Sequence, residues 1–371
     1  MKKQLTIWLI CFLCGSILSA QGLKSWSVEP TLRLGRIIKH TPKLTFDINE
    51  FSYGADVNFL YQTHGRKEWN QLQRYPLLGI ALTYFRMGEP DIIGSAYGIL
   101  PNINIPIRSP KNWKFYFQMG TGIAYLTQEF SEINNPTYNA IGSHVNTIAK
   151  FEFTASHRLN NLWVLNAGLS MTHYSNGGSH LPNFGLNIPA LSFGARYEPK
   201  PVLRKDFVDH GITKDAVKKF GFTAHFALGY RERIVSGGPS YPVYVGSVGA
   251  LYYLNRVNRL IGGVEYEFNE GAYAFGTHVG EFESEKEARQ ESSRIMVYVA
   301  DEFLFGNWSV TVLAGAYTGS FYQVGFPIYN KLITRYYFPP IADKVQMHVG
   351  LYLKSHIVIA EYIGIGVGFA M

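Results

Sequence analysis

A histidine and a serine separated by one residue, His173 and Ser175, lie in a short segment rich in asparagine and glycine. An imidazole can take a proton from a hydroxyl group, and the hydroxyl oxygen can then attack a carbonyl carbon. Side chains two positions apart on a β-strand share one face, so the imidazole can reach the hydroxyl after a modest change of rotamer. The spacing therefore predicts nucleophilic chemistry, provided that the pair lies on a strand.

The residues before the pair have the two-residue period of a β-strand. The apolar positions are Trp163, Leu165, Ala167, Leu169 and Met171, and the positions between them include Asn166, Gly168, Ser170 and Thr172. Continuing this period puts His173 and Ser175 on the apolar face. Extending the alternation of the next strand backwards from Leu191 puts Asn187 on the same face. We therefore predict that all three side chains point outward from the sheet.

Similar alternation recurs along most of the chain, and many of these segments reach the ~10 residues that a tilted strand needs to cross a bilayer. Fifteen strands are expected, at 25–36, 51–62, 76–87, 93–107, 112–127, 142–158, 161–175, 184–197, 218–231, 241–254, 258–268, 293–305, 307–317, 344–355 and 357–370. Another strand could lie within Gln323–Tyr337. The second face of these strands is polar, small or charged, as in a barrel lumen.

The pattern predicts an all-β fold, a transmembrane antiparallel β-barrel. In lipid, only a closed barrel satisfies the backbone groups of every strand. Bacterial barrels carry an even number of strands, so we expect about 14, with a range of 12 to 16. A long soluble β-sandwich is the alternative, because its strands also alternate. If the N-terminus lies on the periplasmic side, the strand that carries His173 ends at the outer surface.

The N-terminus has the features of a secretory signal peptide over residues 1–20. Lys2 and Lys3 precede an apolar run, and cleavage is expected near Ala20. Both cysteines, Cys11 and Cys14, lie inside this segment, so the mature chain would hold no disulfide and no thiolate site. A lipoprotein anchor at Cys14 is a weaker alternative. The formal charge of +7 is scattered along the chain, which argues against a nucleic-acid partner.

The segment His173-x-Ser175-Asn176 followed by Pro182-Asn183-x-Gly185 resembles the lipid A 3-O-deacylase (PagL) / acyloxyacyl hydrolase family of outer-membrane β-barrel esterases. The resemblance implies that Ser175 is the nucleophile and His173 the base. It also implies that Asn176 and Asn183 hold the oxyanion or fix the loop. It covers roughly residues 25–199.

The family's third catalytic member is a glutamate twelve residues after the serine, and this chain has Asn187 there. An amide can orient a histidine, but it does not stabilise imidazolium as a carboxylate does. Glu129 and Glu132 are weak candidates for a substitute carboxylate. We expect a gain in activity from Asn187→Glu.

The resemblance also suggests how the chain is organised. We expect a deacylase-like half of the barrel over 21–199, a charged connector over 200–217 and additional barrel strands over 218–371. The connector could mark a boundary between an eight-stranded first half and an added second half.

The function expected from these observations is hydrolysis of an ester-linked acyl chain of lipid A in the bacterial outer membrane. The partners would be lipopolysaccharide and membrane lipids. We expect no metal and no other cofactor, because the chain has no His-x-x-x-His spacing and no phosphate-binding glycine loop between a strand and a helix. Two alternatives remain. One is a non-catalytic channel or transporter, in which His173 and Ser175 are residues of the interfacial girdle. The other is a phospholipase or acyltransferase.

Overall fold

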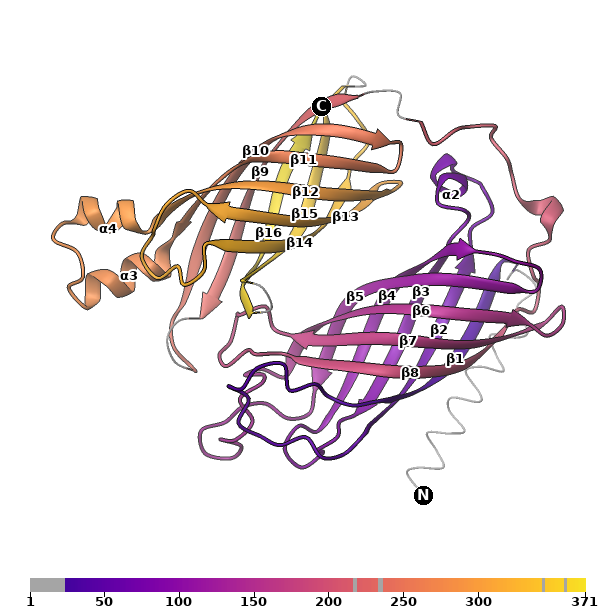
Figure 1. Ribbon diagram of the computed structural model, residues 1–371, viewed down its shortest axis with the longest axis horizontal. Helices are drawn as coiled ribbons and strands as arrows, with labels where there is room; N and C mark the ends of the chain where they lie inside the picture. Colours follow the sequence, from indigo (N-terminus) through magenta and orange to yellow (C-terminus); the bar gives the residue numbers. More distant parts are fainter. Residues whose placement is uncertain (1–23, 216–218, 233–235, 342–343, 357–358) are drawn as a thin grey trace.

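The computed structural model describes residues 24–215, 219–232, 236–341, 344–356 and 359–371 (Figure 1). The expected signal peptide and its cleavage near Ala20 lie outside the described residues. Within them, no helix is long and apolar enough to cross a membrane.

The described chain forms sixteen antiparallel strands that close into two separate barrels of eight. The first barrel contains β1 (Trp26–Gly35), β2 (Ser52–Gln62), β3 (Leu77–Arg86), β4 (Ser95–Arg108), β5 (Trp113–Leu126), β6 (Val145–Arg158), β7 (Trp163–Ser175) and β8 (Leu186–Tyr197). The second contains β9 (Phe220–Glu232), β10 (Ser240–Asn255), β11 (Asn258–Asn269), β12 (Ser293–Phe305), β13 (Trp308–Tyr317), β14 (Ile328–Tyr337), β15 (Gln346–His356) and β16 (Ile359–Ala370). Figure 1 shows the two cylinders next to each other.

The predicted antiparallel β-barrel is confirmed, but the prediction of one barrel of about 14 strands is wrong. Strand β8 pairs with β1, where Leu34 faces Leu191, instead of continuing to β9. Strand β16 closes the second barrel on β9. The total of sixteen strands reaches the upper end of the expected range because β14 forms inside the segment Gln323–Tyr337.

The alternation of the strands separates an apolar outer wall from a charged interior. In the first barrel, Arg33 Nε lies 2.6 Å from Asp56 Oδ2, and Arg33 Nη2 lies 2.8 Å from Glu152 Oε2. In the second, Lys354 Nζ lies 2.6 Å from Glu267 Oε2. A buried charge is tolerated only when a partner compensates for its lost hydration. These ion pairs show how two narrow barrels accommodate the polar faces of their strands.

Among the described residues, three short α-helices and one 3₁₀ turn lie outside the barrel walls. They are α2 (Glu68–Leu72), α3 (Glu270–His278), α4 (Glu285–Glu291) and η1 (Arg204–Asp206), the last within the segment that joins the barrels. The barrels also touch each other. The backbone N–H of Leu181, in the loop between β7 and β8, donates to the carboxylate of Glu232 at the end of β9. The N–H of Glu232 donates to the carbonyl oxygen of Gly178 at 3.2 Å.

Candidate active site

His173 and Ser175 lie at the end of β7, on the outer face of the first barrel. They continue the row of exposed side chains that includes Leu169 and Met171, while Thr172 and Tyr174 between them point inward and are buried. His173 is half-buried, and Ser175 is only 2 % exposed because the loop that follows β7 covers it. The strand thus brings the two predicted residues to one face.

Asn187 faces His173 directly across the β7–β8 pair. Its Oδ1 atom lies 2.7 Å from Nδ1 of His173. In this orientation the amide oxygen accepts the Nδ1–H, so the lone pair of the imidazole is on Nε2. The arrangement prepares His173 as a base at Nε2, the role that the third member of a Ser-His-acid triad supports.

The loop between β7 and β8 directs N–H donors at the serine. Nδ2 of Asn183 donates to Oγ of Ser175 at 2.9 Å, and the backbone N–H of Gly177 donates to the same oxygen at 3.1 Å. Oδ1 of Asn183 in turn accepts the backbone N–H of Asn176 at 3.1 Å. Negative charge that develops at the serine oxygen or next to it would therefore meet donors already in place.

The side chain of Asn176 holds the loop rather than the serine. Its Nδ2 donates to Oγ of Ser143 at 3.0 Å and to the carbonyl oxygen of His180 at 2.9 Å. Its Oδ1 accepts the N–H of Gly178 at 3.0 Å. Of the two asparagines singled out in the sequence, Asn183 thus hydrogen-bonds to the serine, whereas Asn176 hydrogen-bonds to Ser143 and to the loop backbone.

Gly185 sets the position of the imidazole from the other side. Its φ of +77° lies in the left-handed region, and a Cβ atom there would come 2.8 Å from Cε1 of His173. Glycine is the residue that adopts this conformation and allows this approach without strain. In the described part of the chain, no hydrogen bond joins Nε2 of His173 to Oγ of Ser175, whose polar contacts are with Asn183 and Gly177. Catalytic hydrogen bonds are often long in an unliganded enzyme and tighten when substrate binds.

The structure brings neither Glu129 nor Glu132 to the imidazole. Oε1 of Glu129 instead lies 3.5 Å from Nε2 of His144. Over the described ranges, neither glutamate makes a hydrogen bond or an ion pair with His173, so Asn187 occupies the third position without a carboxylate substitute. The residues that the structure describes also hold no group of three or more His, Cys, Asp or Glu side chains that could bind a metal ion.

His40 is a second histidine of the site, and the sequence did not predict it. Nδ1 of His40 lies 3.1 Å from Nδ2 of Asn187, and Nε2 of His40 lies 3.0 Å from the carbonyl oxygen of Phe184. His40 belongs to the loop after β1, which reaches β8 because those two strands close the first barrel. The backbone N–H of Ile38 donates to the carbonyl oxygen of Asn187 at 2.9 Å. No spacing in the sequence indicates this contact, which depends on where the barrel closes.

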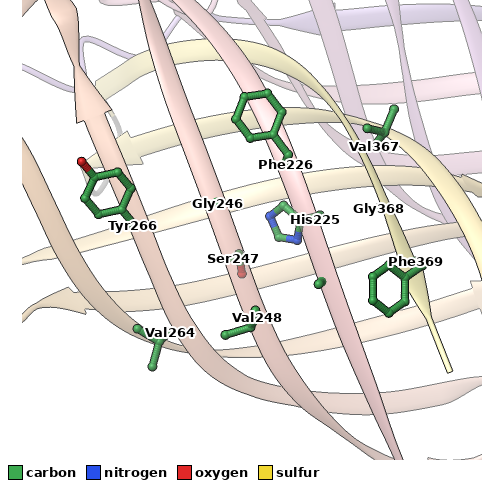
Figure 2. A pocket seen from close by; sticks show the side chains of 11 residues that line it. His225, Phe226, Gly246, Ser247, Val248, Val264, Tyr266, Val367, Gly368 and Phe369 are labelled. Atoms are coloured by element: carbon green, nitrogen blue, oxygen red, sulfur yellow. The ribbon is translucent and has the colours of Figure 1, made fainter.

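A cavity of about 540 Å³ lies on the second barrel, among residues of β9, β10, β11 and β16 (Figure 2). Its lining is mostly apolar, with Phe226, Val248 and Phe369 around small residues such as Gly246. His225 lines it too, but the cavity contains none of the site residues described above. The cavity is therefore separate from the candidate site at the end of β7.

The comparisons with known proteins agree with the resemblance found in the sequence. The family model described as lipid A 3-O-deacylase (PagL) matches residues 53–196, a stretch that includes the predicted site residues from His173 to Asn187. The expected resemblance to this family is thus confirmed for the first barrel. No curated protein matches the chain.

Three solved structures are similar to this chain at low sequence identity. Neisserial surface protein A is 10 % identical, covers 48 % of this chain and 99 % of its own, and has a TM-score of 0.34. The outer membrane enzyme PagL is 14 % identical, covers 45 % of this chain and 97 % of its own, and has a TM-score of 0.31. A mutant of Rh. blastica porin is 9 % identical, covers 94 % of this chain and 99 % of its own, and has a TM-score of 0.17.

Proposed function

We propose that this protein is an outer-membrane serine esterase of the lipid A 3-O-deacylase (PagL) type, which removes an ester-linked acyl chain from lipid A. One observation carries the proposal. Inside the stretch that matches this family, His173 is held by Asn187 at 2.7 Å and shares the outer face of β7 with Ser175. A base, its orienting partner and a nucleophile are thus grouped on one wall of the barrel.

In the proposed reaction, Nε2 of His173 takes the proton of Ser175 as Oγ attacks the carbonyl carbon of the ester. The carbonyl oxygen becomes an oxyanion next to Oγ, and we assign its stabilisation to Nδ2 of Asn183 and the N–H of Gly177, since both donors lie within 3.1 Å of Oγ. The carbon–oxygen bond to the sugar then breaks, and His173 returns the proton to the departing alkoxide. Water, activated by the same imidazole, hydrolyses the acyl-enzyme and releases the fatty acid.

The apolar wall around the site supports a lipid substrate. Leu165, Leu169 and Met171 are exposed on the same face of β7 as the catalytic pair. An acyl chain that lies along this wall would stay in the bilayer while its ester reaches the end of the strand. No large desolvation of the chain would be needed before the reaction.

The contents of both lumens argue against a channel or transporter. An eight-stranded barrel is just wide enough for side chains to fill it. Here buried ion pairs such as Arg33–Asp56 and Lys354–Glu267 occupy the two interiors. Open aqueous channels are a property of wider barrels.

Mass spectrometry of lipids from cells that express the protein tests the proposal. Wild-type protein should remove one acyl chain from lipid A, and His173→Ala and Ser175→Ala should each abolish the removal. Ser240→Ala, at an exposed serine of the second barrel, is the matched control and should act as wild type. Deacylation that survives either active-site substitution would falsify the Ser-His assignment. A change confined to phospholipids, or a gain of an acyl chain, would point to a phospholipase or an acyltransferase instead.

A further inference from the structure

We infer that His40 is a positioning residue of the esterase, which acts on His173 through Asn187. The inference rests on the proposed function and adds a residue that lies outside the stretch matched by the family, since that match begins at residue 53. It explains how an amide can take the place of the expected carboxylate.

A line of four hydrogen-bonding groups crosses the outer face of the first barrel. It runs from the carbonyl oxygen of Phe184 to the ring of His40 at 3.0 Å, from there to Nδ2 of Asn187 at 3.1 Å, and from Oδ1 of Asn187 to Nδ1 of His173 at 2.7 Å. Each link has a direction, because a carbonyl oxygen only accepts and an amide nitrogen only donates.

The direction of each link fixes the proton positions along the line. The carbonyl of Phe184 requires a proton on Nε2 of His40, which leaves the lone pair of the neutral ring on Nδ1. That lone pair accepts Nδ2–H of Asn187 and so turns Oδ1 toward His173. The amide oxygen accepts Nδ1–H of His173, and the lone pair that must take the proton of Ser175 lies on Nε2.

Without an acceptor at position 40, the amide of Asn187 has two available orientations. Rotated by half a turn, it would present Nδ2 to His173, whose Nδ1 would then have to accept. The ring proton would lie on Nε2, and His173 would have no lone pair for Ser175. A wrong tautomer of the catalytic histidine costs several orders of magnitude in rate in a Ser-His-Asp enzyme. His40 therefore selects the productive orientation of the amide.

The backbone around His40 holds the ring in this place. The N–H of Ile38 donates to the carbonyl oxygen of Asn187 at 2.9 Å, and the N–H of His40 donates to the carbonyl oxygen of Ile38 at 3.0 Å. The carbonyl oxygen of Ile38 also lies 3.4 Å from Nδ1 of His40, a longer approach than the one to Asn187. The loop after β1 is thus hydrogen-bonded to the backbone of Asn187, the residue whose side chain His40 orients.

A carboxylate at position 187 would not need His40 to select its orientation. Its two oxygens both accept, so either of them can bind Nδ1–H of His173. The dependence on His40 is therefore a specific consequence of the amide, and it should disappear when the amide is replaced.

Two substitutions of His40 separate its two contacts. In His40→Asn, the side-chain oxygen can replace Nδ1 as the acceptor for Asn187. In His40→Gln, the longer amide can replace the donor to Phe184 but leaves Asn187 without its acceptor. We expect kcat for deacylation of purified lipopolysaccharide to fall by about tenfold or more in His40→Gln, with KM nearly unchanged, and to be largely restored in His40→Asn. His64→Gln, at a histidine beyond the opposite end of β2, is the matched control.

The decisive measurement combines His40→Gln with Asn187→Asp. In the aspartate background, His40→Gln should change kcat less than twofold, so that the two substitutions are strongly non-additive. Equal losses in both backgrounds, or kcat of His40→Gln equal to wild type, would overturn the role of His40. If wild type is active and Ser175→Ala is inactive, either of these outcomes contradicts only the role of His40 and leaves the proposed esterase function standing. Absence of deacylation by wild type would instead overturn the proposed function.

Discussion

Oδ1 of Asn187 lies 2.7 Å from Nδ1 of His173, at the position where the resembling family has a glutamate. The contact has the geometry that a catalytic carboxylate would have, but it lacks the negative charge. In the proposed mechanism, such a contact would orient His173 without stabilising the imidazolium that forms during the reaction.

Asn187→Asp should raise kcat by about tenfold or more, because aspartate has the length of asparagine and adds the missing charge at 2.7 Å from the imidazole. Asn187→Glu should also raise it, but by less, since the additional methylene must be accommodated across the β7–β8 pair. Steady-state kinetics on lipopolysaccharide in detergent checks both. A lower kcat in both variants would show that charge at this position does not limit the reaction.

Asn183→Ala should lower kcat by about 10²- to 10³-fold, because it removes the Nδ2 donor that lies 2.9 Å from Oγ of Ser175. Asn183→Asp keeps the size of the side chain and replaces the donor with an acceptor, so it should be as inactive as the alanine variant. If Asn183→Asp retained wild-type kcat, the side chain would only support the loop.

Gly185→Ala should reduce kcat and also lower the free energy of unfolding by about 1 kcal/mol or more, as expected for a non-glycine residue held at positive φ. The new Cβ atom would also displace the ring of His173, which lies 2.8 Å away. Gly211→Ala is the matched control, because its φ of +63° is similar and no atom lies within 4 Å of the added carbon. The control should share the strain but keep its activity; equal loss of kcat in both would contradict the prediction.

Arg33→Met should destabilise the first barrel by about 3–5 kcal/mol, because it leaves the carboxylates of Asp56 and Glu152 buried without this partner. Lys39→Met removes an exposed pair with Asp47, 3.8 Å apart, and should cost less than about 1 kcal/mol. Urea unfolding in detergent, followed by tryptophan fluorescence, measures both. Similar losses for the two variants would mean that the lumen is hydrated enough to keep the charges without Arg33.

Glu232→Ala should loosen the loop between β7 and β8, since the carboxylate of Glu232 accepts the backbone N–H of Leu181. Limited proteolysis should then cleave between Gly177 and Leu181 faster than in wild type, and kcat should fall because this loop also holds Asn183. Glu281→Ala, at an exposed loop residue, should change neither. Unchanged cleavage in Glu232→Ala would show that the second barrel does not hold the loop.

The outer face of β7 could be predicted from the sequence because its alternation is regular from Trp163 to Met171. The contact with His40 could not, since it requires β1 to pair with β8. In the single barrel expected from the pattern, β8 would have continued to β9, and the loop after β1 would have had no reason to lie near Asn187. The sequence indicates strand β14 only weakly, for a local reason. Leu332 and Ile333 are apolar neighbours on opposite faces, while Lys331 and Arg335 point into the lumen, so the period is blurred.

The closure into two rings of eight strands also determines how wide the interior of each barrel is. Sixteen strands in one ring would surround a bore wide enough for water. Divided into two rings of eight, the same strands keep a comparable total perimeter, and their narrow interiors hold paired charged side chains. An esterase of the proposed kind would therefore act in a bilayer without opening a wide aqueous channel through it.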